Sequence, residues 1–397
     1  MSRHGPIQPG ATLGVFGGGQ LGRMFCQAAA QMGYRTVVFS PKPDSPAAQV
    51  AWKHVRAEFE DEPAVRQFAS QCDAVTIEFE NVPVKALCIA SELTVVRPGP
   101  ALLAVCQDRL RERAFLQAHH LPVAHFRAVH SAADARRAVQ QLAAPVVLKS
   151  ARFGYDGRGQ VRVDRIEDAE DAWVALNVPA ALAEAWVDYQ LELSVLLARS
   201  ADGQIEVFGP IENDHSHHIL DVSVVPARVP KAVAEQAIEL AKRIASDARL
   251  IGLICAEMFL TADGKLLINE LAPRPHNSGH LTIEACSVSQ FQQQVRALCN
   301  LPLGKMHLQA PTAMANLLGD LWPACQSRWH ETLACPNAWL HLYGKTPPRP
   351  GRKMGHLTVR ADSADAADQK ARLLRDQLTR RDGEDTFPDQ PQICGWP

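Results

Sequence analysis

The first third of the chain alternates between two hydrophobic periods. Short apolar runs that end at glycine, serine or proline predict strands, and a longer run with apolar residues on one face predicts a helix. Strands that alternate with helices are typical of a parallel sheet covered by helices, so this part predicts an α/β domain. The expected strands are 12–16, 35–40 and 74–77, and the expected helix is 21–32.

The middle third changes to a strand-rich pattern. Over 189–199, leucine and valine occupy alternate positions, and Glu192 lies on the other face. A turn at Asp202-Gly203 leads into another strand, and Pro230 opens an amphipathic helix. Paired strands with covering helices predict an α+β domain. Further expected elements are a helix at 101–118 and strands at 145–150, 160–163 and 204–208.

The last third is less regular and predicts a small mixed domain. Prolines at 347, 348 and 350 mark a loop before an apolar strand over 355–359. Alanine and leucine at helical spacing predict a helix over 363–378. The remaining residues, 380–397, are polar and contain three prolines, so we expect a mobile tail.

Composition limits the classes of protein to which the chain can belong. At 397 residues it is too long for one ordinary core, so we expect two or three domains. A formal net charge of −2 gives no general attraction to nucleic acid or to anionic membranes. No apolar run approaches the roughly 20 residues that span a bilayer. The 10 cysteines form no Cys-x-x-Cys pair, which favours reduced thiols in a cytoplasmic protein.

Two glutamates in an apolar hairpin are the first candidates for chemistry. The segment 256–270 predicts two strands joined by Asp263-Gly264, and counting outward from a two-residue turn sets Glu257 directly opposite Glu270. Like charges in that position destabilise a sheet and call for a cation. Mg2+ is usually held by one or two carboxylates with substrate phosphates. The pair is therefore either a magnesium site or two unrelated glutamates on a solvated face.

A glycine turn follows the first strand. Gly17-Gly18-Gly19-Gln20-Leu21-Gly22 matches G-x-G-x-x-G between a strand and a helix, where backbone N–H groups can face an anion. A dinucleotide site also needs an acid at the end of the second strand, but that strand ends at Ser40-Pro41, which disfavours NAD. The turn indicates either an anionic small molecule or only close packing of strand and helix.

Two segments suit a nucleotide. Lys149 precedes the glycine-rich stretch 152–160, which lacks the G-K-[ST] of a Walker loop but resembles the glycine-rich β-loop that covers ATP phosphates in protein kinases. The alternative is a hairpin tip with solvated charges. The segment 184–187 has the form of an edge strand whose backbone can hold adenine, with Glu192 for the ribose, although a plain strand edge is the simpler interpretation.

Two further segments suit a polar or phosphorylated substrate. The loop 273–280, which follows Glu270, concentrates histidine, asparagine, serine and arginine in a turn-rich sequence. The basic turn 349–353, with Lys345 upstream, either binds a phosphate or is simply solvated.

Together these segments resemble the 5-(carboxyamino)imidazole ribonucleotide synthases, ATP-grasp enzymes of bacterial and fungal purine synthesis. The motifs GGGQLGRM, EFENVP, GYDGRGQ, INELAPRPHNSGH and RPGRKMGH follow the family's order between Gly14 and about Val359. GYDGRGQ and HNSGH are specific to this branch, whereas the others fit several ATP-grasp ligases. The resemblance implies a homodimer whose α/β N-terminal, α+β ATP-grasp and small mixed C-terminal domains we expect at 1–112, 113–303 and 304–397.

The resemblance also implies a reaction and its ligands. The enzyme would use ATP, bicarbonate and Mg2+, or Mn2+ in its place, to carboxylate the exocyclic amine of 5-aminoimidazole ribonucleotide. The metal would be bound by Glu257 and Glu270. ATP would meet Arg109, Lys149, Gly154, Tyr155, Asp156, Gly157, Arg158, Gly159, Gln160, Glu184, Ala185, Trp186, Val187, Glu192, His215, Asn269 and Glu270. The ribonucleotide would lie near Gly19, Gln20, Leu21, Asn277, Ser278, Lys345, Arg352 and Lys353. The candidates for holding bicarbonate and the amine are Tyr155, Asp156, Arg158, His276 and Glu78.

Three details stand apart from this picture. Phe153 occupies a position where the family commonly has glycine, and Ser216-His217-His218 after His215 is unusual. Strand alternation puts Asn269 on the face opposite Glu270, so its contact with a nucleotide requires a strand end, a bulge or its backbone.

The rival interpretations are a formate-dependent glycinamide ribonucleotide transformylase, a biotin carboxylase subunit, a nucleotide-binding regulatory protein without catalysis and a Rossmann oxidoreductase.

Overall fold

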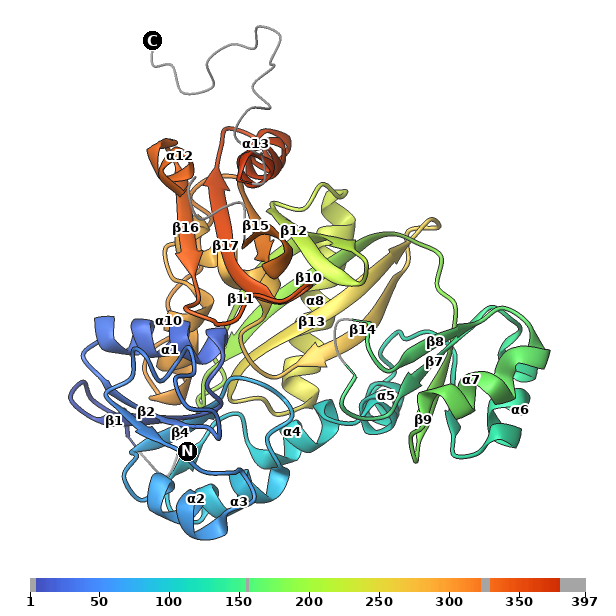
Figure 1. Cartoon of the computed structure of the whole chain (residues 1–397), viewed down its shortest axis with the longest axis horizontal. Coiled ribbons are helices and arrows are strands. Elements are labelled where there is room, and N and C mark those ends of the chain that lie inside the picture. Colours follow the sequence, from blue (N-terminus) through green and yellow to red (C-terminus); the bar gives the residue numbers. More distant parts are fainter. Residues whose placement is uncertain (1–4, 155–156, 323–328, 379–397) are drawn as a thin grey trace, which may run out of the picture.

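The computed structural model describes residues 5–154, 157–322 and 329–378, which form three sheets with their covering helices (Figure 1). The first sheet is parallel and has the strand order β3-β2-β1-β4-β5. The three strands expected here are confirmed to within one residue. The strands are β1 (Thr12–Phe16), β2 (Arg35–Phe39), β3 (Lys53–Val55), β4 (Ala74–Ile77) and β5 (Val95–Val96).

Helices cover both faces of this sheet and bury an apolar core on each. On one face α1 (Gln20–Gln31) packs with α10 (Gln290–Leu298), a helix from much later in the chain. On the other face α2 (Glu62–Ala69) and α3 (Val84–Ser91) cover an aromatic cluster built around Phe16. The expected α/β architecture is therefore confirmed.

The single helix expected over 101–118 is wrong, because the chain forms two helices there. α4 (Pro100–Cys106) ends before Asp108, and α5 (Arg109–Ala118) begins directly after it. The Asp108 carboxylate accepts hydrogen bonds from backbone N–H groups in the first turn of α5, at 3.0 and 3.3 Å, so it acts as an N-cap. α5 thus starts with its own orientation and carries the chain out of the first domain.

The second sheet is small and antiparallel, with the order β6-β9-β7-β8. Two helices and one short 3-10 helix cover it around a separate core. The elements are β6 (Phe126–Val129), α6 (Ala132–Leu142), β7 (Val146–Ser150), β8 (Gln160–Val163), η1 (Ile166–Asp168), α7 (Ala169–Leu176) and β9 (Ala181–Ala185).

The third sheet is antiparallel, has eight strands and forms the centre of the molecule, with the order β14-β13-β10-β11-β12-β15-β17-β16. Its last three strands come from the C-terminal region, so that region extends the central sheet. The strands are β10 (Tyr189–Arg199), β11 (Ile205–Ser216), β12 (Ile219–Val225), β13 (Gly252–Thr261), β14 (Leu266–Ala272), β15 (Thr312–Leu318), β16 (Ala338–Leu342) and β17 (Lys353–Arg360). Its helices are α8 (Lys231–Asp247), η2 (Asn277–Leu281), α9 (Thr282–Ala285), η3 (Gly319–Leu321), α12 (Trp329–Ala334) and α13 (Ala364–Gln377).

The β13–β14 hairpin differs from the expected one in its turn, yet it still pairs the two glutamates. The Thr261 N–H donates to the Lys265 carbonyl at 3.0 Å, so the connection is one residue longer than the expected two-residue turn. That shift alone would set Glu257 opposite Asn269. A bulge at Asn269 restores the register, and Glu257 pairs with Glu270. The predicted turn is wrong, but the predicted pairing is confirmed.

A buried arginine ties this bulge to α5 and to the second sheet. Arg113 on α5 is only 1% exposed, and its guanidinium donates to Glu112 at 2.6 Å, to Glu184 on β9 at 2.9 Å and to the Asn269 carbonyl at 2.6 Å. The second oxygen of Glu112 accepts from the Leu271 N–H at 2.9 Å. One cation therefore fixes α5, β9 and β14 relative to one another.

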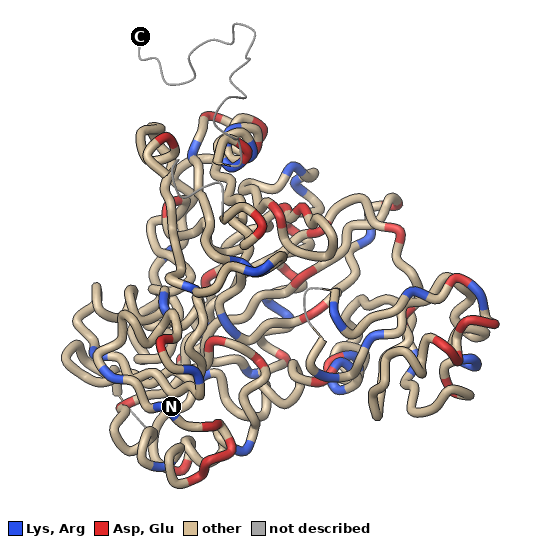
Figure 2. The backbone as a smooth tube through the Cα atoms, viewed as in Figure 1, with Lys and Arg blue, Asp and Glu red and all other residues tan. Residues whose placement is uncertain are grey.

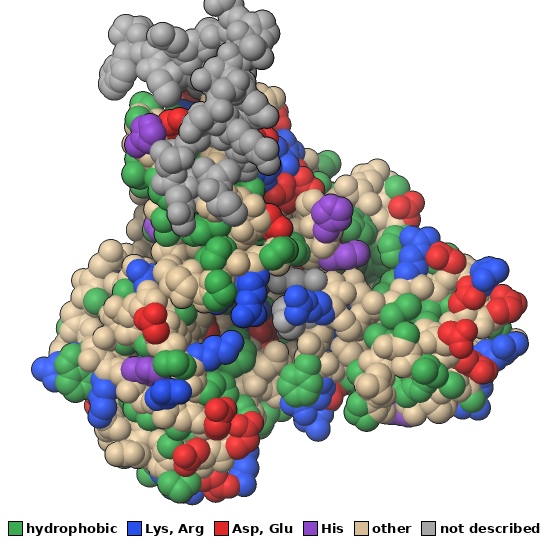
Figure 3. Space-filling model, viewed as in Figure 1, with side chains coloured by type: hydrophobic (Ala, Val, Ile, Leu, Met, Phe, Trp, Pro, Cys, Tyr) green, Lys and Arg blue, Asp and Glu red, His purple; other side chains and the backbone are tan. Residues whose placement is uncertain are grey.

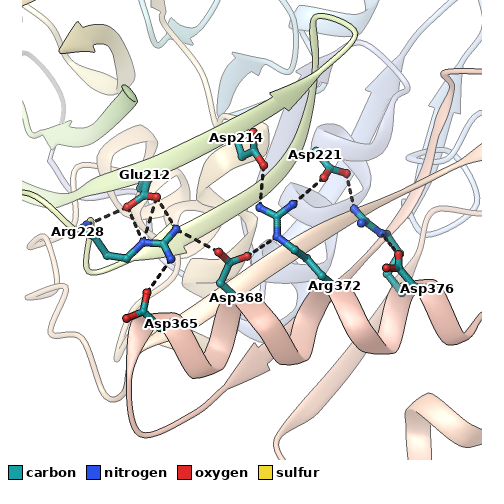
Figure 4. Close-up of polar contacts among 9 residues, drawn as sticks. Glu212, Asp214, Asp221, Arg228, Asp365, Asp368, Arg372 and Asp376 are labelled. Atoms are coloured by element: carbon teal, nitrogen blue, oxygen red, sulfur yellow. Dashed lines mark hydrogen bonds and ion pairs between the residues drawn. The ribbon is translucent and has the colours of Figure 1, made fainter. Parts of the chain in front are cut away.

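Surface ion pairs attach the C-terminal helix to the central sheet. Three arginines bridge α13 and the β11–β12 hairpin, and each contacts at least two carboxylates (Figure 4). The network joins Arg228, Arg372 and Arg375 to Glu212, Asp214, Asp221, Asp365, Asp368 and Asp376.

Two further expectations concern the whole chain. Within residues 5–154, 157–322 and 329–378, no helix is long and apolar enough to cross a membrane. The cysteines in these ranges carry free thiols. The tail expected over 380–397 lies outside the described residues.

The Arg113 contacts predict a large loss of stability when this residue is replaced. Arg113→Met should lower the free energy of unfolding by roughly 3–5 kcal/mol, because it leaves a buried carboxylate without the cation that touches it. Arg66→Met, which removes an exposed ion pair with Glu92, should cost less than about 1 kcal/mol. Urea unfolding of both variants measures the difference, and equal losses would contradict the account.

Candidate active site

The central feature of the site is the opposed pair of glutamates on β13 and β14. Burial and, to a lesser extent, the charge of Glu270 raise the pKa of Glu257 to about 8. Burial also raises the pKa of Glu270, but the positive charges around it together hold that pKa below its usual value. Arg109, whose guanidinium lies 3.6 Å from the carboxylate, contributes most among them. The site thus holds one ionised carboxylate facing one that resists ionisation.

This pair fits a hard divalent cation. A cation between the carboxylates would offset the repulsion that raises the pKa of Glu257. Among the described residues no group of three or more histidine, cysteine, aspartate or glutamate side chains could hold a metal, so the pair would have to share it with other oxygens. Mg2+ is commonly held in this way, by one or two carboxylates together with substrate phosphates.

His276 contacts the pair directly. Its Nε2 lies 2.7 Å from Oε1 of Glu257, and its side chain is largely buried. Burial and, to a lesser extent, the positive charge of Arg274 lower the pKa of His276 to about 3. The ring is therefore neutral over the physiological range, and it occupies only one oxygen of Glu257.

Lys149 on β7 is held in place by Glu184 on the neighbouring strand β9. The Lys149 ammonium lies 2.6 Å from Glu184, whose other oxygen accepts from Arg113. Burial raises the pKa of Glu184, but Lys149 and Arg113 outweigh it and lower the pKa to about 2. Both oxygens of Glu184 are thus occupied by cations. Glu184 positions Lys149, and direct contact between Glu184 and a nucleotide stays a prediction.

The glycine-rich segment closes against the start of its own hairpin. Ser150 N–H donates to the Gly159 carbonyl at 2.7 Å, and a side chain at Gly159, with φ +70°, would lie 2.5 Å from the Ser150 hydroxyl. Gly154 packs beside the Arg109 guanidinium, and Gln160 starts β8 opposite Lys149. Gly157 and Arg158 belong to the same segment, whereas Tyr155 and Asp156 lie outside the described residues.

Phe153 adopts a conformation that suits glycine. Its φ is +64°, in the left-handed region, and its side chain is exposed. This explains why the family's glycine fits the same position. A phenylalanine there raises the energy of the backbone and gains little burial.

In the strand edge that was expected to hold adenine, two backbone N–H groups already donate hydrogen bonds within the protein. The Ala185 N–H donates to the His125 carbonyl at 2.8 Å, and the Trp186 N–H donates to the Pro145 carbonyl at 3.0 Å. Adenine would have to use other backbone groups of this segment, which ends at Val187. Beyond it, Glu192 and His215 lie 3.0 Å apart on β10 and β11, and this contact helps to lower the pKa of Glu192 against the effect of burial.

The N-terminal glycine turn binds an anion that belongs to the chain itself. The N–H groups of Gly19 and Gly22 donate to the two oxygens of Glu78, at 2.5 and 3.0 Å. A side chain at Gly17, with φ +108°, would collide with Glu78. The turn that suggested an anionic ligand therefore holds a carboxylate at the start of α1. Gln20 and Leu21 follow directly in that first turn.

Two cations act on this carboxylate, Lys345 from the C-terminal region and Arg274 from the loop after β14. Burial raises the pKa of Glu78, while the backbone donors and the charges of Lys345 and Arg274 lower it. The Lys345 ammonium donates to the Lys353 carbonyl at 2.7 Å. Arg352 donates to two carbonyls of its own loop, at 3.0 and 2.7 Å, and so holds that loop folded.

Asn277 and Ser278, the two residues of the 273–280 loop that were expected to contact substrate, differ in their hydrogen-bond partners. Asn277 is 7% exposed, and neither its amide nitrogen nor its amide oxygen has a partner among the described residues. Such groups are rare in proteins and indicate a missing ligand or water. Ser278 is 0% exposed and hydrogen-bonds Ser194 at 2.8 Å and His276 at 2.9 Å. Other side chains surround Ser278, and its contact with substrate stays a prediction.

These groups converge where the three sheets meet. Acidic and basic residues from β13, β14, β17 and the first domain approach the same region of the molecule (Figure 2). The space-filling view shows a hollow there, with lysine and arginine side chains at its edge (Figure 3). Sequence reasoning did not include Arg113, Glu112 or Arg274 among the site residues, since each lies in a stretch where charged residues are common and only the fold buries them.

Comparison with known proteins agrees with this geometry. Family models match three consecutive parts of the chain: a ribonucleotide synthetase preATP-grasp domain at 10–107, an ATP-grasp domain at 114–291 and a phosphoribosylaminoimidazole carboxylase C-terminal domain at 312–370. The fold and the site define an ATP-grasp ligase.

Whole-chain relatives make the assignment specific. The N5-carboxyaminoimidazole ribonucleotide synthase of Bacillus subtilis is 41% identical over 377 residues, which cover 95% of this chain and 98% of that protein. The enzyme of Brucella melitensis is 41% identical over 354 residues, with coverages of 89% and 97%. The chain belongs to the N5-carboxyaminoimidazole ribonucleotide synthase family.

Solved structures of relatives share the fold at full length. An ADP complex of an N5-carboxyaminoimidazole ribonucleotide synthetase superposes with a TM-score of 0.90 and 40% identity, covering 96% of this chain and 100% of that one. The Aspergillus clavatus enzyme, in complex with ADP and 5-aminoimidazole ribonucleotide, gives a TM-score of 0.86 and 33% identity, with coverages of 93% and 98%.

The raised pKa of Glu257 predicts how its replacement changes stability. The ordinary value is 4.5 and the folded value is about 8, so between these pH values the folded protein holds a proton that the unfolded chain releases. Stability of the ligand-free protein should therefore fall as pH rises through this window. Glu257→Gln should match the wild type near pH 4.5 and melt higher by about 2–4 °C at pH 8.

The same variant should lose turnover with Mg-ATP, because an amide cannot replace a metal-binding carboxylate. The exposed Glu235→Gln on α8 is the control, and it should change neither the melting temperature nor the turnover. Thermal unfolding across pH together with steady-state kinetics provides the check. A Glu257→Gln enzyme with normal turnover would rule out the metal site.

Proposed function

We propose that this cleft carries out the reaction of its family, the ATP-dependent carboxylation of 5-aminoimidazole ribonucleotide to its N5-carboxyamino product in purine biosynthesis. Bicarbonate is a poor electrophile, so the γ-phosphoryl group of ATP is first transferred to it, which gives carboxyphosphate and ADP. The exocyclic amine then attacks the carboxyl carbon, or the CO2 that carboxyphosphate releases. A C–N bond forms, phosphate leaves and the amine gives up a proton.

The opposed glutamates are the observation that carries this proposal. When bound, Mg2+ would neutralise charge on the ATP phosphates, and Glu257 and Glu270 are the residues that would hold it. Phosphoryl transfer depends on positioning and charge neutralisation more than on a protein nucleophile. Lys149, held by Glu184, and Arg109, beside Glu270, would supply positive charge to the same phosphates.

Glu78 is our candidate for the group that accepts the proton lost by the amine. Its carboxylate is held by the glycine turn at the edge of the first domain, and Lys345 and Arg274 lie close enough to affect its pKa. Burial raises that pKa, which favours uptake of a proton. The unpartnered amide of Asn277 would bind the substrate nearby.

The reaction can be tested by phosphate release. Phosphate should appear from Mg-ATP only when bicarbonate and 5-aminoimidazole ribonucleotide are both present, apart from a slow background hydrolysis. Formate with glycinamide ribonucleotide should not replace them. Release that depends on the formate pair would instead support the rival transformylase.

The ribonucleotide phosphate is expected beside Lys345, Arg352 and Lys353. Arg352→Ala should raise the KM for the ribonucleotide about tenfold and change that for ATP little, because a charged hydrogen bond contributes roughly 1.5–3 kcal/mol. Arg137→Ala, on the remote helix α6, is the control. Initial-rate kinetics with each substrate varied in turn measures both constants, and an unchanged ribonucleotide KM would remove this assignment.

We also propose that the chain forms a homodimer in the cytoplasm. The family resemblance supports the dimer, and the free thiols suit a reducing compartment. Sedimentation equilibrium should give about twice the chain mass of 43.4 kDa, and a single-chain mass would contradict the dimer. Cell fractionation tests the location.

A further inference from the structure

A chain of buried hydrogen bonds crosses the central sheet and ends on His276. Ser223 on β12 donates to Oδ1 of Asn213 on β11 at 2.9 Å, and Nδ2 of Asn213 donates to the Ser194 hydroxyl on β10 at 2.9 Å. Ser194 and Ser278 hydroxyls lie 2.8 Å apart, and the Ser278 hydroxyl lies 2.9 Å from Nδ1 of His276. The first four side chains are at most 5% exposed.

Two orders of the protons preserve every hydrogen bond of this chain. Either every donor points toward His276, or every donor points away and Nδ1 of His276 carries a proton. The Ser278 backbone N–H decides between them, because it donates to the same Nδ1 at 3.3 Å. A nitrogen that faces a fixed N–H must accept, so the donors point toward His276.

The order of these donors fixes the tautomer of the ring. With Nδ1 accepting, the proton of the neutral imidazole resides on Nε2. Nε2 lies 2.7 Å from Oε1 of Glu257, so His276 donates a hydrogen bond to that oxygen. Oε2 of Glu257 remains for a ligand. Ser194 also pairs in register with Glu257 across β10 and β13, so the chain and the carboxylate share one part of the sheet.

The backbone of His276 is held independently of its ring. Its N–H donates to Oε1 of Gln290 at 2.9 Å, and Nε2 of Gln290 donates back to its carbonyl at 2.8 Å. Gln290 is 0% exposed. The ring and the main chain are thus fixed by separate buried groups, so His276 has little freedom to move or to change tautomer.

We propose that Ser223, Asn213, Ser194 and Ser278 are positioning residues that hold His276 as a hydrogen-bond donor to Glu257. His276 then orients the metal-binding carboxylate and is not the general base. The proposal rests on the proposed function for the identity of the metal site. It explains why these four polar side chains lie buried in the sheet, since each would be costly to bury without the next.

The tautomer can be observed directly in the free protein. Nitrogen-15 NMR of protein labelled in its histidines distinguishes a protonated ring nitrogen from an unprotonated one, and His276→Gln identifies the signals. The proposal requires Nε2 to be protonated and Nδ1 to be bare at neutral pH. A proton on Nδ1 would overturn it, whatever reaction the enzyme catalyses.

The role of the chain can be tested by metal binding without turnover. Ser194→Ala and Ser278→Ala should each weaken the binding of Mn2+ in the presence of the ATP analogue AMP-PNP by about tenfold or more, because loss of such outer-shell partners typically costs 10–100-fold. Ser200→Ala is the matched control: its side chain is also buried, directly after β10, but its hydrogen bonds to described residues all stay within its own turn. Electron paramagnetic resonance of free Mn2+ measures the affinity.

The outcomes of this binding test separate the two proposals. If wild-type protein with AMP-PNP does not bind Mn2+, the proposed metal site fails. If it binds and the Ser194 and Ser278 variants bind equally well, only the positioning chain fails. Far-ultraviolet circular dichroism and the melting temperature show whether the variants are folded. If either variant is unfolded, the NMR measurement of the His276 tautomer in the wild type still tests the proposal.

Replacement of His276 distinguishes a donor from a base. His276→Gln retains an N–H that can reach Glu257, so kcat should stay within about tenfold of the wild type, whereas His276→Ala should lose 10–100-fold. Removal of a general base typically costs 10²–10⁴-fold with either substitution. Equal, large losses in kcat for His276→Gln and His276→Ala would overturn the donor role.

Discussion

The account depends on two carboxylates that the sheet holds face to face. Glu257 and Glu270 occupy opposed positions on β13 and β14, where like charges repel and burial already disfavours ionisation. Arg109 compensates one of them, and His276 donates a hydrogen bond to the other. The pair is thus less favourable in the free protein than it would be with a cation between its oxygens. We regard this imbalance as the source of affinity for Mg2+ and for the phosphates that share it.

The fold maintains this pair through contacts that lie outside it. The bulge at Asn269 sets the register, and Arg113 holds the bulge carbonyl while it also anchors Glu184 and hence Lys149. A single buried arginine therefore fixes the metal carboxylates and the phosphate lysine relative to each other. On the other side of the site, the glycine turn holds Glu78 toward Lys345 and Arg274. The three sheets contribute separate groups, and the chemistry becomes possible only where they meet.

Much of this arrangement could be predicted from sequence, and the failures have physical causes. Periodicity found β1, β4 and β10 because buried strands leave a clear local pattern. It merged α4 with α5, because the break depends on one capping aspartate, and it missed the longer turn of the β13–β14 hairpin. The glutamate pair was still predicted, since the longer turn and the bulge shift the register in opposite directions. Arg113 could not be assigned, and the burial of Ser278 could not be foreseen, because long-range partners decide both and no local pattern records those.

The central claim is that Glu257 must lose a proton when the metal and the nucleotide bind. Isothermal titration calorimetry of Mg2+ with AMP-PNP, in buffers of different ionisation enthalpy at pH 7, counts the protons released on binding. With the pKa of Glu257 raised to about 8 in the free protein, the wild type should release close to one more proton than Glu257→Gln does. Equal proton release from the two proteins would show that Glu257 is already ionised, and it would contradict the account.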